Sequence, residues 1–182
     1  MAHRKPNHAD AELMLKLYDL RRESVMRASR KTLLHWIPKS VDDLLQIAKL
    51  DHPDNAAWRQ VASYFEMAYG LAKNGIVPPD FVAENNGEGL VLYAKIEPFL
   101  EAYRTATTPH AFANAEWLVR HSKYARERLA LHHKRLATLR DVPLPPPAQK
   151  ETQEQIQTQV RPQTQKTTPN NPPKHTQPSS TS

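Results

Sequence analysis

The sequence predicts an all-α protein, an irregular bundle of about five helices with a disordered C-terminal tail. Apolar residues recur at spacings of three and four, which is the period of an amphipathic helix. Capping residues, prolines and an Asn-Gly pair separate these stretches. No window shows the strict alternation of a half-buried strand. The predicted organisation is a flexible N-terminus at 1–9, a helical domain at 10–141 and a disordered tail at 142–182.

The first predicted helix begins at about Asp10, a residue type that favours the N-cap position. It fades near Trp36, because Pro38 disfavours the helical conformation in the residue before it. It runs through residues at helical spacing: Leu13, Leu17, Leu20, Ser24 and Ala28.

A short second helix is predicted after Ser40, because the segment 40–43 resembles a capping box with Asp in place of Glu. The third helix follows a loop and spans about 55–74. It ends at Gly75, since glycine readily adopts the left-handed conformation of a helix C-terminus. Two adjacent apolar rows cover most of this helix, which places it in the middle of the domain: Trp58, Ala62, Phe65, Tyr69, Ala72 and Ala57, Val61, Tyr64, Ala68, Leu71.

A short helical turn at 78–80 and a break at 85–89 precede the fourth helix. Pro98 predicts either a kink in this helix or the start of its second half. The fifth helix is predicted to start at Thr108-Pro109 and to reach Asp141. Small residues in its apolar seam permit close packing, so we expect another helix of this chain or of a second copy along it. The seam consists of Ala111, Ala115, Leu118, Ser122, Ala125, Leu129, His132, Leu136 and Leu139.

The C-terminal segment has a composition typical of disorder. Residues 143–182 hold nine of the sixteen prolines and few apolar residues, so they cannot bury enough apolar surface to offset the entropy of ordering. Its Pro-Leu-Pro-Pro-Pro run at 143–147 leaves two interpretations open, a polyproline II docking segment and a solubilising linker.

The composition also excludes several classes of site. The chain has no cysteine, which rules out disulfides, thiol catalysis and cysteine-ligated metals. It shows no signal-peptide pattern and no run approaching the ~20 apolar residues of a membrane span. A cytoplasmic protein without membrane contact is therefore expected.

The net charge of +6 is unevenly distributed: residues 1–40 carry +5, residues 41–119 carry −6 and residues 120–142 carry +5. An acidic middle can neutralise the two basic ends internally, so a nucleic-acid partner is less favoured than a protein partner. Nucleic-acid binding would require the cations of the last helix to face solvent without carboxylate partners. These cations are Arg120, Lys123, Arg128, Lys134 and Arg135.

Common enzymatic signatures are missing, including GxGxxG, Walker A, GxSxG and HExxH. No catalytic residue, cofactor or metal site is therefore predicted.

His110, His121 and His132 recur every eleven residues. Eleven helical residues span ~16 Å, too far for ligands of one metal ion.

The candidate site is a polar cluster at the third helix. Arg59, Ser63, Glu66, Gly70 and Lys73 form one polar stripe on a helix that is otherwise apolar. Arginines of the first helix and carboxylates of the 84–88 turn are the expected partners of this stripe. Such a network is either a functional site or a set of register-fixing ion pairs. The candidate residues are Arg21, Arg22, Arg59, Glu66, Glu84, Asn86 and Glu88.

Four stretches resemble a family of small uncharacterised bacterial proteins, largely acidobacterial. They are LKLYDLRR at 15–22, WRQVASYFEM at 58–67, the segment 75–88 and YAKIEP at 93–98. The resemblance covers about residues 10–105 and implies an all-helical fold. The family has no established activity, so the resemblance implies no site residues.

These observations rank three hypotheses for the function. The first is a non-enzymatic interaction or scaffold protein that binds protein partners, with a homo-oligomer through the last helix as one form. The second is a nucleic-acid-associated protein that uses the basic first and last helices. The third is an enzyme or small-ligand binder that uses the Arg/Glu cluster.

Overall fold

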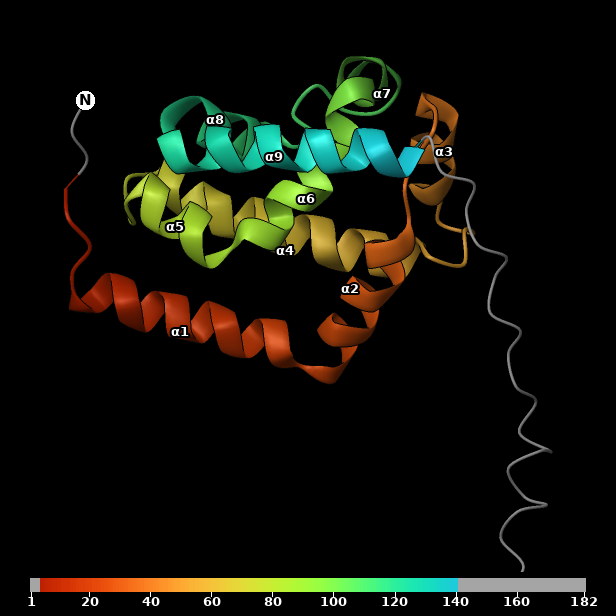
Figure 1. Cartoon of the computed structure of the whole chain (residues 1–182). Coiled ribbons are helices and arrows are strands. Elements are labelled where there is room, and N and C mark those ends of the chain that lie inside the picture. Colours follow the sequence, from red (N-terminus) through yellow and green to blue (C-terminus); the bar gives the residue numbers. More distant parts are fainter. Residues whose placement is uncertain (1–3, 141–182) are drawn as a thin grey trace, which may run out of the picture. The chain divides into compact units, whose positions relative to one another are not determined.

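The computed structural model describes residues 4–140, and the predictions for the tail at 142–182 lie outside this range. The described residues form helices and no strand, which confirms the all-α class. Figure 1 shows α4 in the interior, α9 alongside α5 and α6, and α1 on the opposite side. The elements are α1 (His8–Arg22), α2 (Ser24–His35), α3 (Val41–Ile47), α4 (Asn55–Lys73), α5 (Pro79–Asn85), α6 (Gly87–Ile96), the 3₁₀ helix η1 (Glu97–Phe99), α7 (Leu100–Ala106), α8 (Ala113–His121) and α9 (Lys123–Arg140).

The prediction of about five helices was too low for three reasons. The first and last predicted helices are each broken once, η1 divides the fourth into α6 and α7, and the predicted turn at 78–80 is the helix α5. Glu23 adopts an extended conformation that separates α1 from α2. Ser122 does the same between α8 and α9. Its hydroxyl donates to the Asp80 carboxylate and accepts a hydrogen bond from the Ala125 amide at 2.9 Å, so local capping replaces the continuous helix.

Two predicted helix starts were also displaced. Asp10 is not the N-cap of α1: Asn7 is, and Asp10 completes a capping box by accepting from the Asn7 amide at 2.7 Å. The last segment does not start at Thr108-Pro109, because α8 begins after Phe112. Phe112 has a φ of 55°, a left-handed conformation that costs a bulky residue about 1–3 kcal/mol. Tertiary contacts of its ring and of α8 offset this cost.

Other local predictions were confirmed. Ser40 and Asp43 form the capping box of α3. Gly75 follows α4 with a φ of 71°, as a helix C-terminus requires. Pro98 lies in η1, which interrupts the helical path between α6 and α7.

α4 is the central helix, as its two apolar rows predict. It packs against α2, α5, α6 and α8. Seven of its apolar side chains are buried in the core: Trp58, Val61, Tyr64, Phe65, Ala68, Tyr69 and Ala72. The central position follows from a helix that has apolar residues on most of its sides.

The apolar seam of the last two helices is covered within the chain. α9 packs on α6 and α5, and Leu118, Ala125, Leu129 and Leu136 are all buried. Leu139, at the end of the seam, is 52% exposed. The partner helices expected along the seam are therefore α4, which packs on α8, and α6, which packs on α9. The homo-oligomer stays a prediction.

The contact between α6 and α4 depends on Gly89. A β-carbon at this position would collide with the Tyr69 hydroxyl and the Phe65 ring. We expect Gly89→Ala to lower the free energy of unfolding by about 1–3 kcal/mol, because overpacking outweighs the higher helix propensity of alanine. Gly87→Ala is the matched control, since a β-carbon there meets nothing within 4 Å. Equal stability of the two variants in urea denaturation would contradict this close packing.

Candidate functional site

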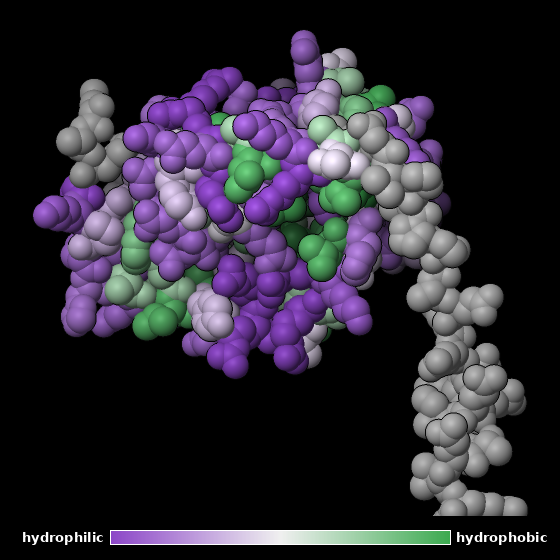
Figure 2. Space-filling model, viewed as in Figure 1, coloured by the Kyte–Doolittle hydropathy of each residue, from purple (hydrophilic) through white to green (hydrophobic). Residues whose placement is uncertain are grey.

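The first candidate site is a groove between α1 and α5, which we call the α1 groove. It has a volume of about 540 Å³. Leu15 and Tyr18 line it and remain 65% and 47% exposed, respectively. Figure 2 shows hydrophobic surface at the lower left of the domain, where α1 runs in Figure 1. The complete lining is Ala11, Met14, Leu15, Tyr18, Arg21, Phe81, Glu84, Asn85 and Asn86.

The groove is apolar because α1 is apolar on more than one side. Its inner face buries Met14 and Leu17 against the domain, and the Leu17 carbonyl accepts a hydrogen bond from the Tyr64 hydroxyl at 2.7 Å. Leu15 and Tyr18 lie off this inner face. Their apolar surface is therefore available to a partner.

Polar residues border the groove. Arg21 donates to the Asn85 carbonyl at 3.3 Å and thus links the end of α1 to the end of α5. The guanidinium groups of Arg21 and Arg22 lie 5.2 and 5.6 Å from the centre of the Tyr18 ring, within cation–π range. Glu84 is an exposed carboxylate on the α5 side.

Asn86 has a structural role at the base of the groove. Its side chain is buried and donates to the Val82 carbonyl at 3.3 Å. Its own carbonyl accepts a hydrogen bond from the buried Tyr69 hydroxyl at 2.7 Å. These contacts fix the junction of α5 and α6 against α4.

The structure therefore brings four of the seven predicted site residues to one place: Arg21, Arg22, Glu84 and Asn86 lie in or beside the α1 groove. The other three lie elsewhere. Glu88 accepts from Arg30 Nε at 2.8 and 2.9 Å, not from the arginines of α1. The break at Glu23 is the reason, because it turns α2 toward α4 and brings Arg30 to the start of α6.

Glu66 has a partner that the sequence analysis did not identify. Its carboxylate accepts hydrogen bonds from the backbone amides of Asn114 at 3.0 Å and Ala115 at 2.8 Å. It thereby caps the N-terminus of α8, where no side chain of α8 itself does so. Burial raises the pKa of Glu66, and the two amide hydrogen bonds oppose this shift. These contacts do not include the expected polar network of Arg59 and Glu66 with the arginines of α1.

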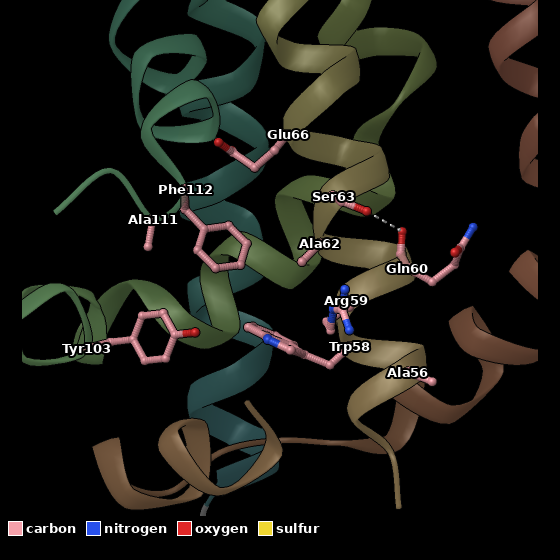
Figure 3. Close-up of a pocket in the computed structure, with 10 residues that line it drawn as sticks. All are labelled: Ala56, Trp58, Arg59, Gln60, Ala62, Ser63, Glu66, Tyr103, Ala111 and Phe112. Carbon is pink, nitrogen blue, oxygen red and sulfur yellow. Dashed lines mark hydrogen bonds between the residues drawn. The ribbon is translucent and has the colours of Figure 1, made fainter. Parts of the chain in front are cut away.

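Arg59 is exposed and lines a second cleft (Figure 3). Glu66 lines the same cleft, so these two predicted residues share a cavity without forming an ion pair. The helical period places Arg59 and Glu66 on one face of α4, and both line this cleft. The period could not show that backbone amides of α8 would meet the carboxylate.

The cations of α8 and α9 have mixed surroundings. Arg120 pairs with Glu116, and Lys123 lies 3.8 Å from Glu127. Arg126 donates to the Arg120 carbonyl at 2.9 Å. Lys134 and Arg135 are exposed. Part of this basic surface is therefore neutralised by neighbouring carboxylates, which weakens the nucleic-acid alternative.

Sequence reasoning missed the apolar residues of the α1 groove, although the chain carries a signal for them. Six of the eight residues from Leu13 to Leu20 are apolar, more than one buried face requires. The contribution of Phe81 could not be read in this way. It depends on the packing of α5 near α1, which no local pattern encodes.

Residues 7–122 match a family model described as a domain of unknown function (DUF4760). The match spans α1 to the end of α8 and includes both clefts. No curated protein and no solved structure matches the chain. Within residues 4–140, no helix combines the length and apolar character that a membrane crossing requires.

Proposed function

We propose that this chain, which belongs to the DUF4760 family of unknown function, is a non-enzymatic interaction protein that binds another protein through the α1 groove. One observation carries the proposal: the helix α1 leaves Leu15 and Tyr18 exposed along a groove of about 540 Å³. Contiguous exposed apolar surface with a polar border is typical of protein-binding sites.

The geometry favours an amphipathic helix of the partner as the occupant. A groove between two helices accepts apolar side chains from a third helix at spacings of three and four. Leu15, Tyr18 and Phe81 would contact those side chains. Arg22, exposed beyond the end of the groove, would pair with a carboxylate on the edge of the partner helix.

A cytoplasmic location and a bacterial source remain sequence-based predictions that accompany this proposal. The exposed part of the basic surface, including Lys134 and Arg135, would then set solubility and long-range attraction. It would not form the main contact.

Site-specific photo-crosslinking tests the proposal. A photoreactive amino acid at position 15 should yield one dominant cross-linked partner in cells, and the same group at position 50 should not. Leu50 is the matched control because it is 82% exposed and lies outside the groove. The partner is then purified, and its affinity for the intact chain is measured.

Tyr18→Ala and Leu15→Asp should each weaken that complex by at least about tenfold. Tyrosines are enriched among the hot spots of interfaces, whose truncation costs about 2 kcal/mol or more, and an aspartate at position 15 would bury a charge in the contact. Folding should change by less than about 1 kcal/mol, because both side chains are largely exposed. Leu50→Asp should leave the affinity unchanged. Equal cross-linking at positions 15 and 50, or cross-linking only between copies of this chain, would contradict the proposal.

A further inference from the structure

A second cavity lies between α4 and the segment that joins α7 to α8, and we call it the α4 cleft (Figure 3). Its volume is about 520 Å³, enough for a small organic molecule. It shares no lining residue with the α1 groove. Figure 3 shows the side chains of Tyr103 and Phe112 directed across the cleft toward α4.

Three aromatic side chains line this cleft, Trp58, Tyr103 and Phe112. The ring centres of Trp58 and Phe112 are 5.6 Å apart, and Trp36 packs against the far side of Trp58 at 5.4 Å. Tyr103 lines the cleft together with Trp58. Each of the three lining rings is more than nine-tenths buried, so only an edge of each faces the cavity. The aromatic surface is therefore preorganised.

The polar part of the cleft contains one cation, Arg59, and one carboxylate, Glu66. Arg59 is exposed at its rim and makes no ion pair with a carboxylate of residues 4–140. Glu66 is the acidic residue of the lining, and its carboxylate is occupied by the two amides of α8. Ser63 and Gln60 add neutral hydrogen-bonding groups beside Arg59.

We propose that the α4 cleft binds a small aromatic carboxylate. The carboxylate would pair with the guanidinium of Arg59, a geometry that allows two parallel hydrogen bonds. The planar ring would pack against the edges of Trp58 and Phe112, an arrangement that aromatic groups favour. This ligand site goes beyond the protein contact at the α1 groove and does not depend on it.

The test compares two probes of the same shape, naphthalene-2-acetate and its neutral amide. Binding to the full chain is measured by calorimetry and by quenching of tryptophan fluorescence. The carboxylate should bind at least about tenfold more tightly than the amide, as expected of a charge-assisted contact. Arg59→Gln should remove this difference while leaving amide binding unchanged, and Arg59→Lys should restore part of it.

Arg27→Gln is the matched control, because it removes one exposed positive charge from α2, away from the cleft. It should leave the tenfold preference intact. Equal binding of the two probes, or a preference that survives Arg59→Gln, would overturn the proposal. Loss of the preference in Arg27→Gln would overturn it too, since net charge rather than the cleft would then explain it. Variants at the α1 groove should bind both probes normally.

Discussion

Replacing Phe65 with alanine should lower the free energy of unfolding by about 3–5 kcal/mol. Phe65 lies at the centre of α4 and is 3% exposed. Its ring packs edge-on against Tyr64 at 5.1 Å and near Tyr69 at 6.1 Å, and Gly89 allows α6 to approach it closely. Truncation would leave a cavity enclosed by Tyr64 and Tyr69 of α4 and by Gly89 of α6. These neighbours are packed in the core and cannot move to fill it.

Met67→Ala provides the matched control for this prediction. Met67 is also apolar and lies two residues further along α4, but it is 47% exposed. Its removal should change stability by about 0.5 kcal/mol or less. Urea denaturation of both variants would give the comparison. A loss from Phe65→Ala as small as that from Met67→Ala would show that α4 is not the centre of the core.

The second large effect concerns Lys95, a lysine in the core of the domain. Its side chain is 3% exposed, and its Nζ donates to the carbonyls of Leu33 at 2.7 Å and Leu34 at 2.9 Å at the end of α2. Burial lowers the pKa of Lys95 from 10.5 to about 8, because the charged form loses its hydration. Between these two values the folded state binds fewer protons than the unfolded state. The free energy of unfolding must therefore rise with pH across this interval.

We expect Lys95 to contribute about 3 kcal/mol of additional stability as the pH rises from about 8 to 10.5, from 1.36 kcal/mol per pKa unit. The contribution is fully present above 10.5 and is lost as the pH falls through about 8. The measurement is the stability of the wild type relative to Lys95→Met at each pH. This difference cancels the opposing effect of the buried tyrosines Tyr64 and Tyr93, whose pKa values are raised by burial.

Lys73→Met serves as the control, because Lys73 is exposed at the end of α4. The difference between wild type and Lys73→Met should stay flat from pH 7 to 10. A flat difference for Lys95→Met as well would mean that the Lys95 amine reaches solvent. A difference of the opposite sign would contradict the direction of the pKa shift.

Local sequence patterns predicted the central helix and several helix ends. The apolar rows of α4 mark it as enclosed, and Gly75 marks its end through a backbone conformation that other residues avoid. Such features depend on residues close together in the chain. Predictions of this kind were confirmed for α4 and for the start of α3, but not for the starts of α1 and α8, which begin at other residues.

The breaks at Glu23 and Ser122 could not be predicted in this way. Each of the two residues lies within a stretch of uninterrupted helical periodicity. Local preference therefore favours one long helix through Glu23 and another through Ser122. Ser122 leaves the helix because Asp80, 42 residues away, accepts its hydroxyl hydrogen bond. The number of helices was therefore underestimated where a tertiary contact competes with the helical backbone.

The candidate site shows the same division. The sequence by itself determined which residues are polar on an apolar helix and that α1 carries more apolar surface than one face can bury. Only the tertiary structure decided the partners: Arg30 for Glu88, the amides of α8 for Glu66, and Phe81 for the groove beside Tyr18. The physical reason is that helical periodicity fixes the direction of a side chain relative to its own helix axis. The groups it meets depend on how distant helices pack, and that is set by the shape of the whole core.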